Sequence, residues 1–159
     1  MRLFIGSFAK INEYDKIKEK FDPFFDGKWI DKKNLHITYK FLGNIDDVNK
    51  IISNLKNIVY PKNEIIKFGS FELFNNKIFF ASSNNDILYD VNSKIDQRLQ
   101  NIYPDSKKFI PHITLMRIKK IKDDNYTYML NKQSEDIFIK LKVSLIKSES
   151  GQYSTVEEF

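Results

Sequence analysis

The chain of 159 residues has no cysteine, and this absence excludes disulfide bonds, thiolate metal sites and cysteine nucleophiles. It also has no glycine-rich phosphate loop and no His-Glu-x-x-His metal motif. A zinc site built on the two histidines would need nearby carboxylates, and neither histidine has one in its motif. These absences count against a metal site of these kinds and against a nucleotide held by a phosphate loop.

Long apolar runs are also missing. No segment approaches the roughly 18 apolar residues that a membrane-spanning helix needs. The apolar segment at residues 1–8 is too short for the core of a signal peptide and is followed at once by charged residues. The chain is 42% hydrophobic and 30% charged, which is typical of a globular protein rather than a disordered one. We expect a soluble cytoplasmic protein that folds as one domain over residues 1–159.

The charge balance is basic, with 26 lysines and arginines against 21 acidic residues and a formal net charge of +5. Such a balance favours polyanionic partners through long-range steering, without any reading of sequence. The positive charge is spread over many lysines, so by itself it is only a weak indication of nucleic-acid binding.

Histidine is scarce as well, and the only two copies occur in the same tripeptide, His36-Ile37-Thr38 and His112-Ile113-Thr114. Both tripeptides lie in apolar, β-branched runs that predict strands. Alternate side chains of a strand point to opposite faces, so each histidine shares a face with the threonine two residues later. The isoleucine between them faces the other way. Each motif therefore offers an imidazole and a hydroxyl side by side.

Hydrophobic periodicity and turn residues predict an alternation of strands and helices along the chain. Asp86 is the expected N-cap of the third helix. The predicted order is a strand at 2–8, a helix within 12–25, a strand at 34–42, a helix at 48–58, strands at 65–74 and 77–82 joined by a turn at 75–76, a helix at 86–102, a strand at 110–118, an unpatterned polar stretch to 135, and strands at 136–148 and 153–158.

The two motifs lie 76 residues apart, and the predicted elements repeat with nearly the same offset. Phe4 superposes on Phe80, and the helix beginning near residue 11 superposes on the one beginning at residue 87. The strand beginning at residue 65 falls on one beginning at residue 141. This agreement predicts an internal duplication with two lobes related by a pseudo-twofold axis. The expected fold is α+β, with two antiparallel sheets flanking a central cleft and helices on the outside.

Two facing histidines fit acid/base chemistry. An imidazole has an ordinary pKa of about 6.5, so at neutral pH one histidine can accept a proton while the other donates one. The hydroxyls of Thr38 and Thr114 are neutral donors suited to anionic oxygens. A single histidine on a strand is more often structural, and threonine is common in strands. A Ser-His-Asp triad would leave the second histidine unexplained.

Arg117 follows the second motif and could bind a phosphate through its guanidinium. Strict alternation would place it on the face opposite His112, so a bulge, a twist or the strand end has to turn it round. A solvated arginine at a strand end is the competing interpretation.

Four further residues near the motifs have less specific interpretations. Lys40 shares the face of the first motif under strict alternation and could contact an RNA backbone, although a plain surface lysine is the safer prediction. Phe41, Phe109 and Met116 could line a cleft, but core positions are the more common outcome for such residues.

Four segments of the sequence resemble a known family. The segments LHITYKFLG and PHITLMR, with MRLFIGSF at the start and Ser148, Gly151 and Tyr153 near the end, resemble the two-histidine (2H) phosphoesterase superfamily. Within it they are similar to the RNA 2′,3′-cyclic phosphodiesterases, the LigT-like group of 2′-5′ RNA ligases. The resemblance covers essentially the whole chain. It implies a bilobal fold and hydrolysis of a 2′,3′-cyclic phosphate to a 2′-phosphate without metal or nucleotide cofactor.

The resemblance also assigns roles. His36 matches the proton donor to the leaving oxygen, and His112 matches the proton acceptor that activates water. Thr38 and Thr114 match the hydroxyls that bind phosphate, and Arg117 matches the basic residue after the second motif. The residues themselves leave open which histidine is the acid.

The implied partners are RNA ends or small nucleotides that carry a cyclic phosphate, and the implied state is a monomer without an obligate protein partner. Three alternatives stay open. The chain could be a 2′,5′ RNA ligase, a phosphodiesterase on another cyclic compound such as ADP-ribose cyclic phosphate or on a 2′,5′-linked oligonucleotide, or a non-catalytic RNA-binding module.

Overall fold

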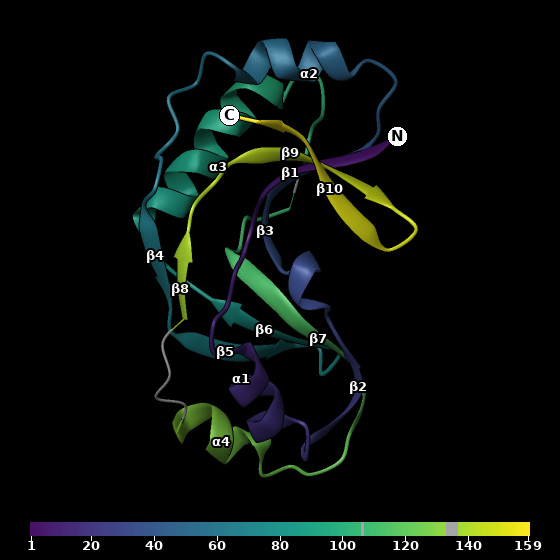
Figure 1. Cartoon of the computed structure of the whole chain (residues 1–159), viewed down its shortest axis with the longest axis vertical. Coiled ribbons are helices and arrows are strands. Elements are labelled where there is room, and N and C mark those ends of the chain that lie inside the picture. The colour runs from purple at the N-terminus through teal and green to yellow at the C-terminus, as the bar shows by residue number, and fades with distance from the viewer. Residues whose placement is uncertain (106, 133–136) are drawn as a thin grey trace.

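The computed structural model describes residues 1–105, 107–132 and 137–159. These residues form an eight-stranded antiparallel sheet, a second sheet of two strands and four α-helices (Figure 1). In chain order the elements are β1 (Arg2–Phe8), α1 (Tyr14–Phe21), β2 (Phe25–Trp29), the 3-10 turn η1 (Lys32–Asn34), β3 (His36–Asn44), α2 (Val48–Leu55), β4 (Ile65–Phe68), β5 (Ser70–Phe74), β6 (Ile78–Ser82), α3 (Asp86–Leu99), β7 (His112–Ile121), α4 (Tyr126–Lys132), β8 (Ile137–Lys140), β9 (Ser144–Glu149) and β10 (Gln152–Glu158). Within the described residues, no helix is long and apolar enough to cross a membrane.

The strand order of the large sheet is nearly symmetric about the two motif strands, except that among the strands that the structure describes β10 and β2 have no counterparts in the other half. The order is β10-β9-β1-β3-β7-β6-β5, and β2 pairs with β7 in addition. The halves meet at one residue pair, Ile37 opposite Ile113, in an antiparallel contact between β3 and β7. The α+β class is therefore confirmed, whereas the two sheets expected from the sequence are two halves of one continuous sheet.

The small sheet repeats this symmetry. Strand β4 pairs with β8 in antiparallel register, with Ile65 opposite Lys140 and Phe68 opposite Ile137. Strand β4 precedes β5 and strand β8 precedes β9, and β5 and β9 each lie second from the motif strand of their half. Antiparallel pairing between equivalent elements is the arrangement that a twofold axis produces. The division into two pseudo-twofold lobes stays a prediction, which this topology supports.

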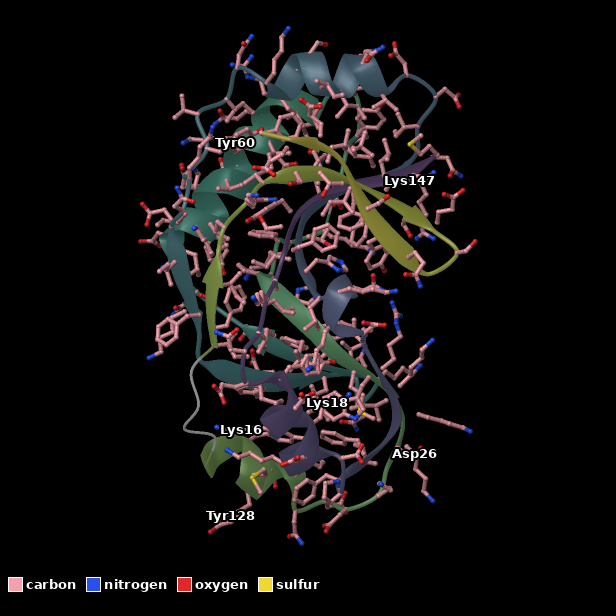
Figure 2. All side chains as sticks on the ribbon, in the orientation of Figure 1. Lys16, Lys18, Asp26, Tyr60, Tyr128 and Lys147 are labelled. Atoms are coloured by element: carbon pink, nitrogen blue, oxygen red, sulfur yellow. The ribbon has the colours of Figure 1, made fainter. Side chains whose placement is uncertain are left out.

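The helices cross between the halves. Helix α3 packs behind β3, where Asn92 donates to the carbonyl oxygen of Tyr39 at 2.9 Å. Helix α1 packs behind β7, where the Tyr14 hydroxyl donates to the carbonyl oxygen of Leu115 at 3.1 Å. In Figure 1, α2 and α3 accordingly lie at the end of the molecule formed by β1, β3 and β9, and α1 and α4 lie at the end formed by β5, β6 and β7. Lys16 and Lys18 of α1 lie at the second end, and Lys147 of β9 lies at the first (Figure 2).

Both motif strands carry a β-bulge at the same position. In β3, Lys40 pairs with Ile5 and Thr38 with Gly6, so Tyr39 has no partner on β1. In β7, Met116 pairs with Phe79 and Thr114 with Phe80, so Leu115 has no partner on β6. A bulge interrupts the alternation of faces. Accordingly, the nine residues from His36 and the nine from His112 follow one burial pattern, with two consecutive buried residues after each threonine.

The pairings also correct the superposition of the first strand. Gly6, and not Phe4, occupies the position equivalent to Phe80, since Gly6 lies opposite Thr38 and Phe80 opposite Thr114. The reason is a local offset of 74 residues in this strand, which the 76-residue spacing of the motifs does not show.

Several predicted elements differ from the structure. Helix α1 ends at Phe21, just before Pro23, and the following residues form strand β2 instead of continuing the helix. The polar stretch after the second motif strand contains helix α4. Asn85, rather than Asp86, caps α3 by accepting a hydrogen bond from the Ile87 amide.

The predicted turn at 75–76 agrees with the structure, whereas the predicted strand at 65–74 is two strands, β4 and β5. The turn between β5 and β6 has left-handed backbone at Asn75 and Asn76, with φ values of 49° and 55°. The predicted strand at 136–148 is two strands, β8 and β9, and its first residue, Asp136, lies outside the described residues.

Candidate active site

The contact between β3 and β7 brings the two His-x-Thr motifs together. Ile37 and Ile113 face each other and are fully buried. Extending this register by one residue places His36 opposite Thr114 and Thr38 opposite His112. Diagonal neighbours in an antiparallel pair lie about 7–8 Å apart, which is the separation expected for the backbones of the two histidines. The two histidines and the two threonines are partly exposed, on the face of the sheet opposite to the buried isoleucines.

Both imidazoles are held in the same way. Nδ1 of His36 lies 2.6 Å from the carbonyl oxygen of Asn34, and Nδ1 of His112 lies 2.6 Å from that of Ile110. A carbonyl oxygen can only accept, so Nδ1 carries the proton and donates it in each case. This bond fixes the tautomer and the ring orientation. Nε2 is then the ring atom left to take or give a proton on both histidines.

Aromatic rings cover each imidazole. The ring of Phe4 is 4.9 Å from that of His36, and the ring of Tyr153 is also 4.9 Å away at an interplanar angle of 82°. On the other side, Phe80 lies 5.4 Å from His112 at 67°. These contacts restrict each imidazole to one position and remove part of its surface from water.

Burial makes His36 a weaker base. Removal of its imidazole from water lowers the pKa below the ordinary value of 6.5, and the positive charges of His112 and Arg117 lower it further. The hydrogen bond to the Asn34 carbonyl acts in the opposite direction. The electrostatic influence of two groups from β7 on a histidine of β3 agrees with the register in placing these side chains in one region.

The β-bulge in each motif strand determines which later side chains point to the same face as the histidines. Because Leu115 and Met116 are both buried, Arg117 returns to the exposed face of His112 and Thr114. The bulge that the sequence required for this residue is therefore present.

The equivalent bulge in β3 removes Lys40 from that face. Its side chain is 1% exposed and bonded to Asp96 at 2.7 Å, so the prediction of a surface lysine that could touch RNA is wrong. Phe41 takes the exposed position instead, 63% exposed, so its predicted place in the core is also wrong. Met116 is core, as predicted, and Phe109 packs against the core between Tyr39 and Tyr89.

Sequence reasoning missed two parts of the site. Asn34 is buried and donates to the carbonyl oxygen of Gly151 at 3.1 Å, which ties the turn before β10 to the first motif. Tyr153 entered the sequence interpretation only as part of a resemblance, yet its ring contacts His36. No periodicity predicts these contacts, because they join segments more than 100 residues apart.

The described residues contain no group of three or more histidine, aspartate and glutamate side chains that could hold a metal ion. The donors that converge on the site are two imidazoles, two hydroxyls and one guanidinium, which suit an anion. An ester of phosphoric acid fits this set, since the hydroxyls and the guanidinium can bind its oxygens while the imidazoles move protons.

Comparisons with known proteins agree with this chemistry. The family model described as LigT-like phosphoesterase matches residues 9–80, which include the first motif. Proteins named RNA 2′,3′-cyclic phosphodiesterase from Methanocaldococcus jannaschii and Aquifex aeolicus are each 29% identical to this chain. The alignments cover 100% of this chain and 100% and 96% of theirs.

The fold is shared with a solved structure, that of TT0787 from Thermus thermophilus. Its TM-score is 0.75 at 19% identity, with 100% of this chain and 97% of that chain covered. The sequence matches span both motifs, and the fold match spans the whole chain. This chain is therefore similar in sequence to the LigT-like phosphoesterases over residues 9–80, and to the two proteins named RNA 2′,3′-cyclic phosphodiesterase over its whole length.

Proposed function

We propose that this protein hydrolyses the 2′,3′-cyclic phosphate of RNA ends or nucleotides to a 2′-phosphate, without a metal ion, by paired-histidine acid/base catalysis. One observation carries the proposal: two His-x-Thr pairs lie on adjacent strands, and Nδ1–H of each histidine donates a hydrogen bond to a carbonyl oxygen. Both Nε2 atoms are thereby available to one substrate.

In the proposed reaction, Nε2 of His112 accepts a proton from water while the water oxygen forms a bond to phosphorus. The bond between phosphorus and the 3′-oxygen breaks, and Nε2 of His36 donates a proton to that oxygen. The product is a 2′-phosphate with a free 3′-hydroxyl. Each proton transfer contributes on the order of 10² to 10⁴ in rate. Proton exchange with solvent then restores both imidazoles.

The remaining groups act on the phosphate. Negative charge grows on its non-bridging oxygens as water attacks, and the hydroxyls of Thr38 and Thr114 can donate hydrogen bonds to them. Arg117 supplies positive charge on the same face. The curated relatives named as RNA 2′,3′-cyclic phosphodiesterases support this substrate class, and the net charge of +5 is compatible with an anionic substrate.

The lowered pKa of His36 bears on its role as the acid. In the free protein this histidine is neutral at pH 7, because its pKa lies below 6.5. An anionic phosphate bound opposite it favours the charged imidazolium and raises the pKa. In the proposed mechanism, the bound phosphate therefore favours the protonated imidazole that the donor role of His36 requires.

Single substitutions test the proposal. His36→Ala and His112→Ala should each lower kcat on guanosine 2′,3′-cyclic phosphate by at least about 10², because each removes one proton transfer. Thr38→Ser should keep most activity and Thr38→Val should lose it, since only serine keeps the hydroxyl.

Circular dichroism of the histidine variants provides the folding control. Native spectra with lost turnover support the proposal, and native spectra with full turnover contradict it. Unfolding of both variants would favour a structural role for the histidines. The cytoplasmic location and the monomeric state stay predictions from the sequence.

A further inference from the structure

Strand β2 adds a surface beside the site that the first half of the molecule lacks. It pairs with the outer part of β7, from Phe25 opposite Ile121 to Trp29 opposite Met116. The inner part of β7 carries the second motif and contacts β3. Strand β2 therefore lies next to the segment of β7 that follows the second motif, and it extends the exposed face of the site along β7. In Figure 1 this strand runs along one side of the molecule, toward the end that carries α4.

Lys28 lies directly opposite Arg117 in this pairing. Its neighbour Trp29 points to the core side, where the indole packs 6.0 Å from Phe79 and donates to Asp22 at 2.9 Å. Successive residues of a strand face opposite ways, so Lys28 points to the other side. Arg117 points there too, because Met116 and Ile118 on either side of it are buried. The two cations are thus neighbours on the face of His112.

Among the residues that the structure describes, no acidic side chain neutralises this pair. No side chain in the described ranges forms an ion pair with Lys28 or Arg117. Like charges directly opposite each other on adjacent strands are destabilising. Two exposed cations held side by side next to a phosphate-binding face are an arrangement that an anionic ligand stabilises.

We infer that Lys28 binds the RNA phosphate that precedes the terminal nucleotide, while Arg117 binds the reacting cyclic phosphate. The inference rests on the proposed function and adds a preference for oligonucleotides over mononucleotides. Strands β2 and β3 pair with the same edge of β7, and Lys28 lies beyond the first motif strand along that edge. Arg117 is close enough to His36 to act on it electrostatically. A mononucleotide ends at the cyclic phosphate, whereas an oligonucleotide has a further phosphate to reach that strand.

The test compares two substrates: guanosine 2′,3′-cyclic phosphate, and a dinucleotide that ends in the same group. Lys28→Ala should lower kcat/KM for the dinucleotide about tenfold, through KM, and change the mononucleotide value by less than about twofold. Lys28→Arg should keep the dinucleotide value. The slope of log kcat/KM against log salt should fall by about one for the dinucleotide. Lys56→Ala is the control, since Lys56 caps α2 at the opposite end of the molecule (Figure 1).

Two results would overturn the inference: an unchanged dinucleotide value, or an equal loss on both substrates. Absence of turnover by the unsubstituted protein on both substrates would overturn the proposed function instead. Calorimetric binding of a dinucleotide with a terminal 2′-phosphate then still measures the contact. Weaker binding in Lys28→Ala, with unchanged binding of guanosine 2′-phosphate, supports it, and equal binding of the dinucleotide by both proteins contradicts it.

Discussion

Tyr14 holds the bulge of the second motif strand, because its hydroxyl donates to the carbonyl oxygen of Leu115 at 3.1 Å. The carbonyl oxygen of Ile30 accepts from the same hydroxyl. Burial raises the pKa of Tyr14 well above its ordinary value, so this hydroxyl stays a donor at any physiological pH. A helix of one half thereby fixes the strand segment that turns Arg117 toward the histidines of both halves.

Replacing Tyr14 by phenylalanine should therefore affect both stability and Arg117. The Leu115 carbonyl keeps its hydrogen bond from the Ile30 amide at 2.8 Å, whereas the Ile30 carbonyl loses the Tyr14 hydroxyl. The loss should cost about 1–3 kcal/mol, which urea unfolding measures. In addition, KM for the cyclic phosphate should rise. The rise should disappear in an Arg117→Ala background, because both substitutions then act on the same contact. Additive effects on KM would show that Tyr14 does not act through Arg117.

The buried Lys40 offers a contrast between charge and volume. Met116 occupies the position in β7 that Lys40 occupies in β3. The substitution Lys40→Met therefore introduces the side chain found at the equivalent position and keeps the side-chain volume nearly unchanged. Asp96 is 37% exposed and can be hydrated, so this variant should change the unfolding free energy by less than about 1.5 kcal/mol. Lys40→Ala leaves a cavity and should cost about 2–4 kcal/mol. Both should keep kcat per folded molecule. Lost RNA turnover in a folded Lys40→Met protein would show that this lysine serves the substrate after all.

Gly6 is required by a close approach of two strands. A Cβ atom at this position would lie 2.3 Å from the carbonyl oxygen of Ile37, between His36 and Thr38. Gly6→Ala should therefore displace the first motif, lowering stability by about 1–3 kcal/mol and kcat as well. Gly43→Ala is the comparison, since Gly43 has a φ of +77° and open space around it. That variant carries backbone strain without touching the motif, so it should lose stability and keep kcat. Equal kcat in the two variants would contradict the placement of Gly6.

The lowered pKa of His36 predicts a pH effect on stability. The unfolded chain binds a proton at this residue near pH 6.5, while the folded protein binds it only at a lower pH. As pH falls below about 6.5, the unfolded state therefore gains protons first and folding loses free energy; the loss is complete below the folded pKa. His36→Gln should remove this part of the pH dependence. An NMR titration checks it directly: a His36 pKa above 6.5 in the free protein would contradict the effect of burial, and added phosphate should raise the value.

Sequence alone predicted the parts of the fold that depend on local pattern. Strands at the two motifs, the amphipathic helices and the Asn75-Asn76 turn all follow from spacing within about ten residues. Helix α4 was missed because its residues, Tyr126–Lys132, show no clear apolar face, and β2 was missed because its apolar start continued the pattern of α1.

The residues that the candidate site brings together could be named from the sequence, whereas the residues around them could not. Duplicated His-x-Thr motifs identify four residues, and the need for a bulge beside Arg117 could be stated in advance. Nothing in the sequence places that bulge after Thr114, nor its twin after Thr38. This single uncertainty reversed the predicted faces of Lys40 and Phe41, since one extra residue moves all later side chains to the other face.

The most direct test of the account is phosphorus NMR of the products formed from guanosine 2′,3′-cyclic phosphate in the presence of a chelator. The account predicts guanosine 2′-phosphate as the product of the unsubstituted protein, and no product from folded His36→Ala or His112→Ala. Formation of the 3′-phosphate would contradict the breaking of the bond to the 3′-oxygen. Full turnover by either histidine variant would contradict paired-histidine catalysis itself.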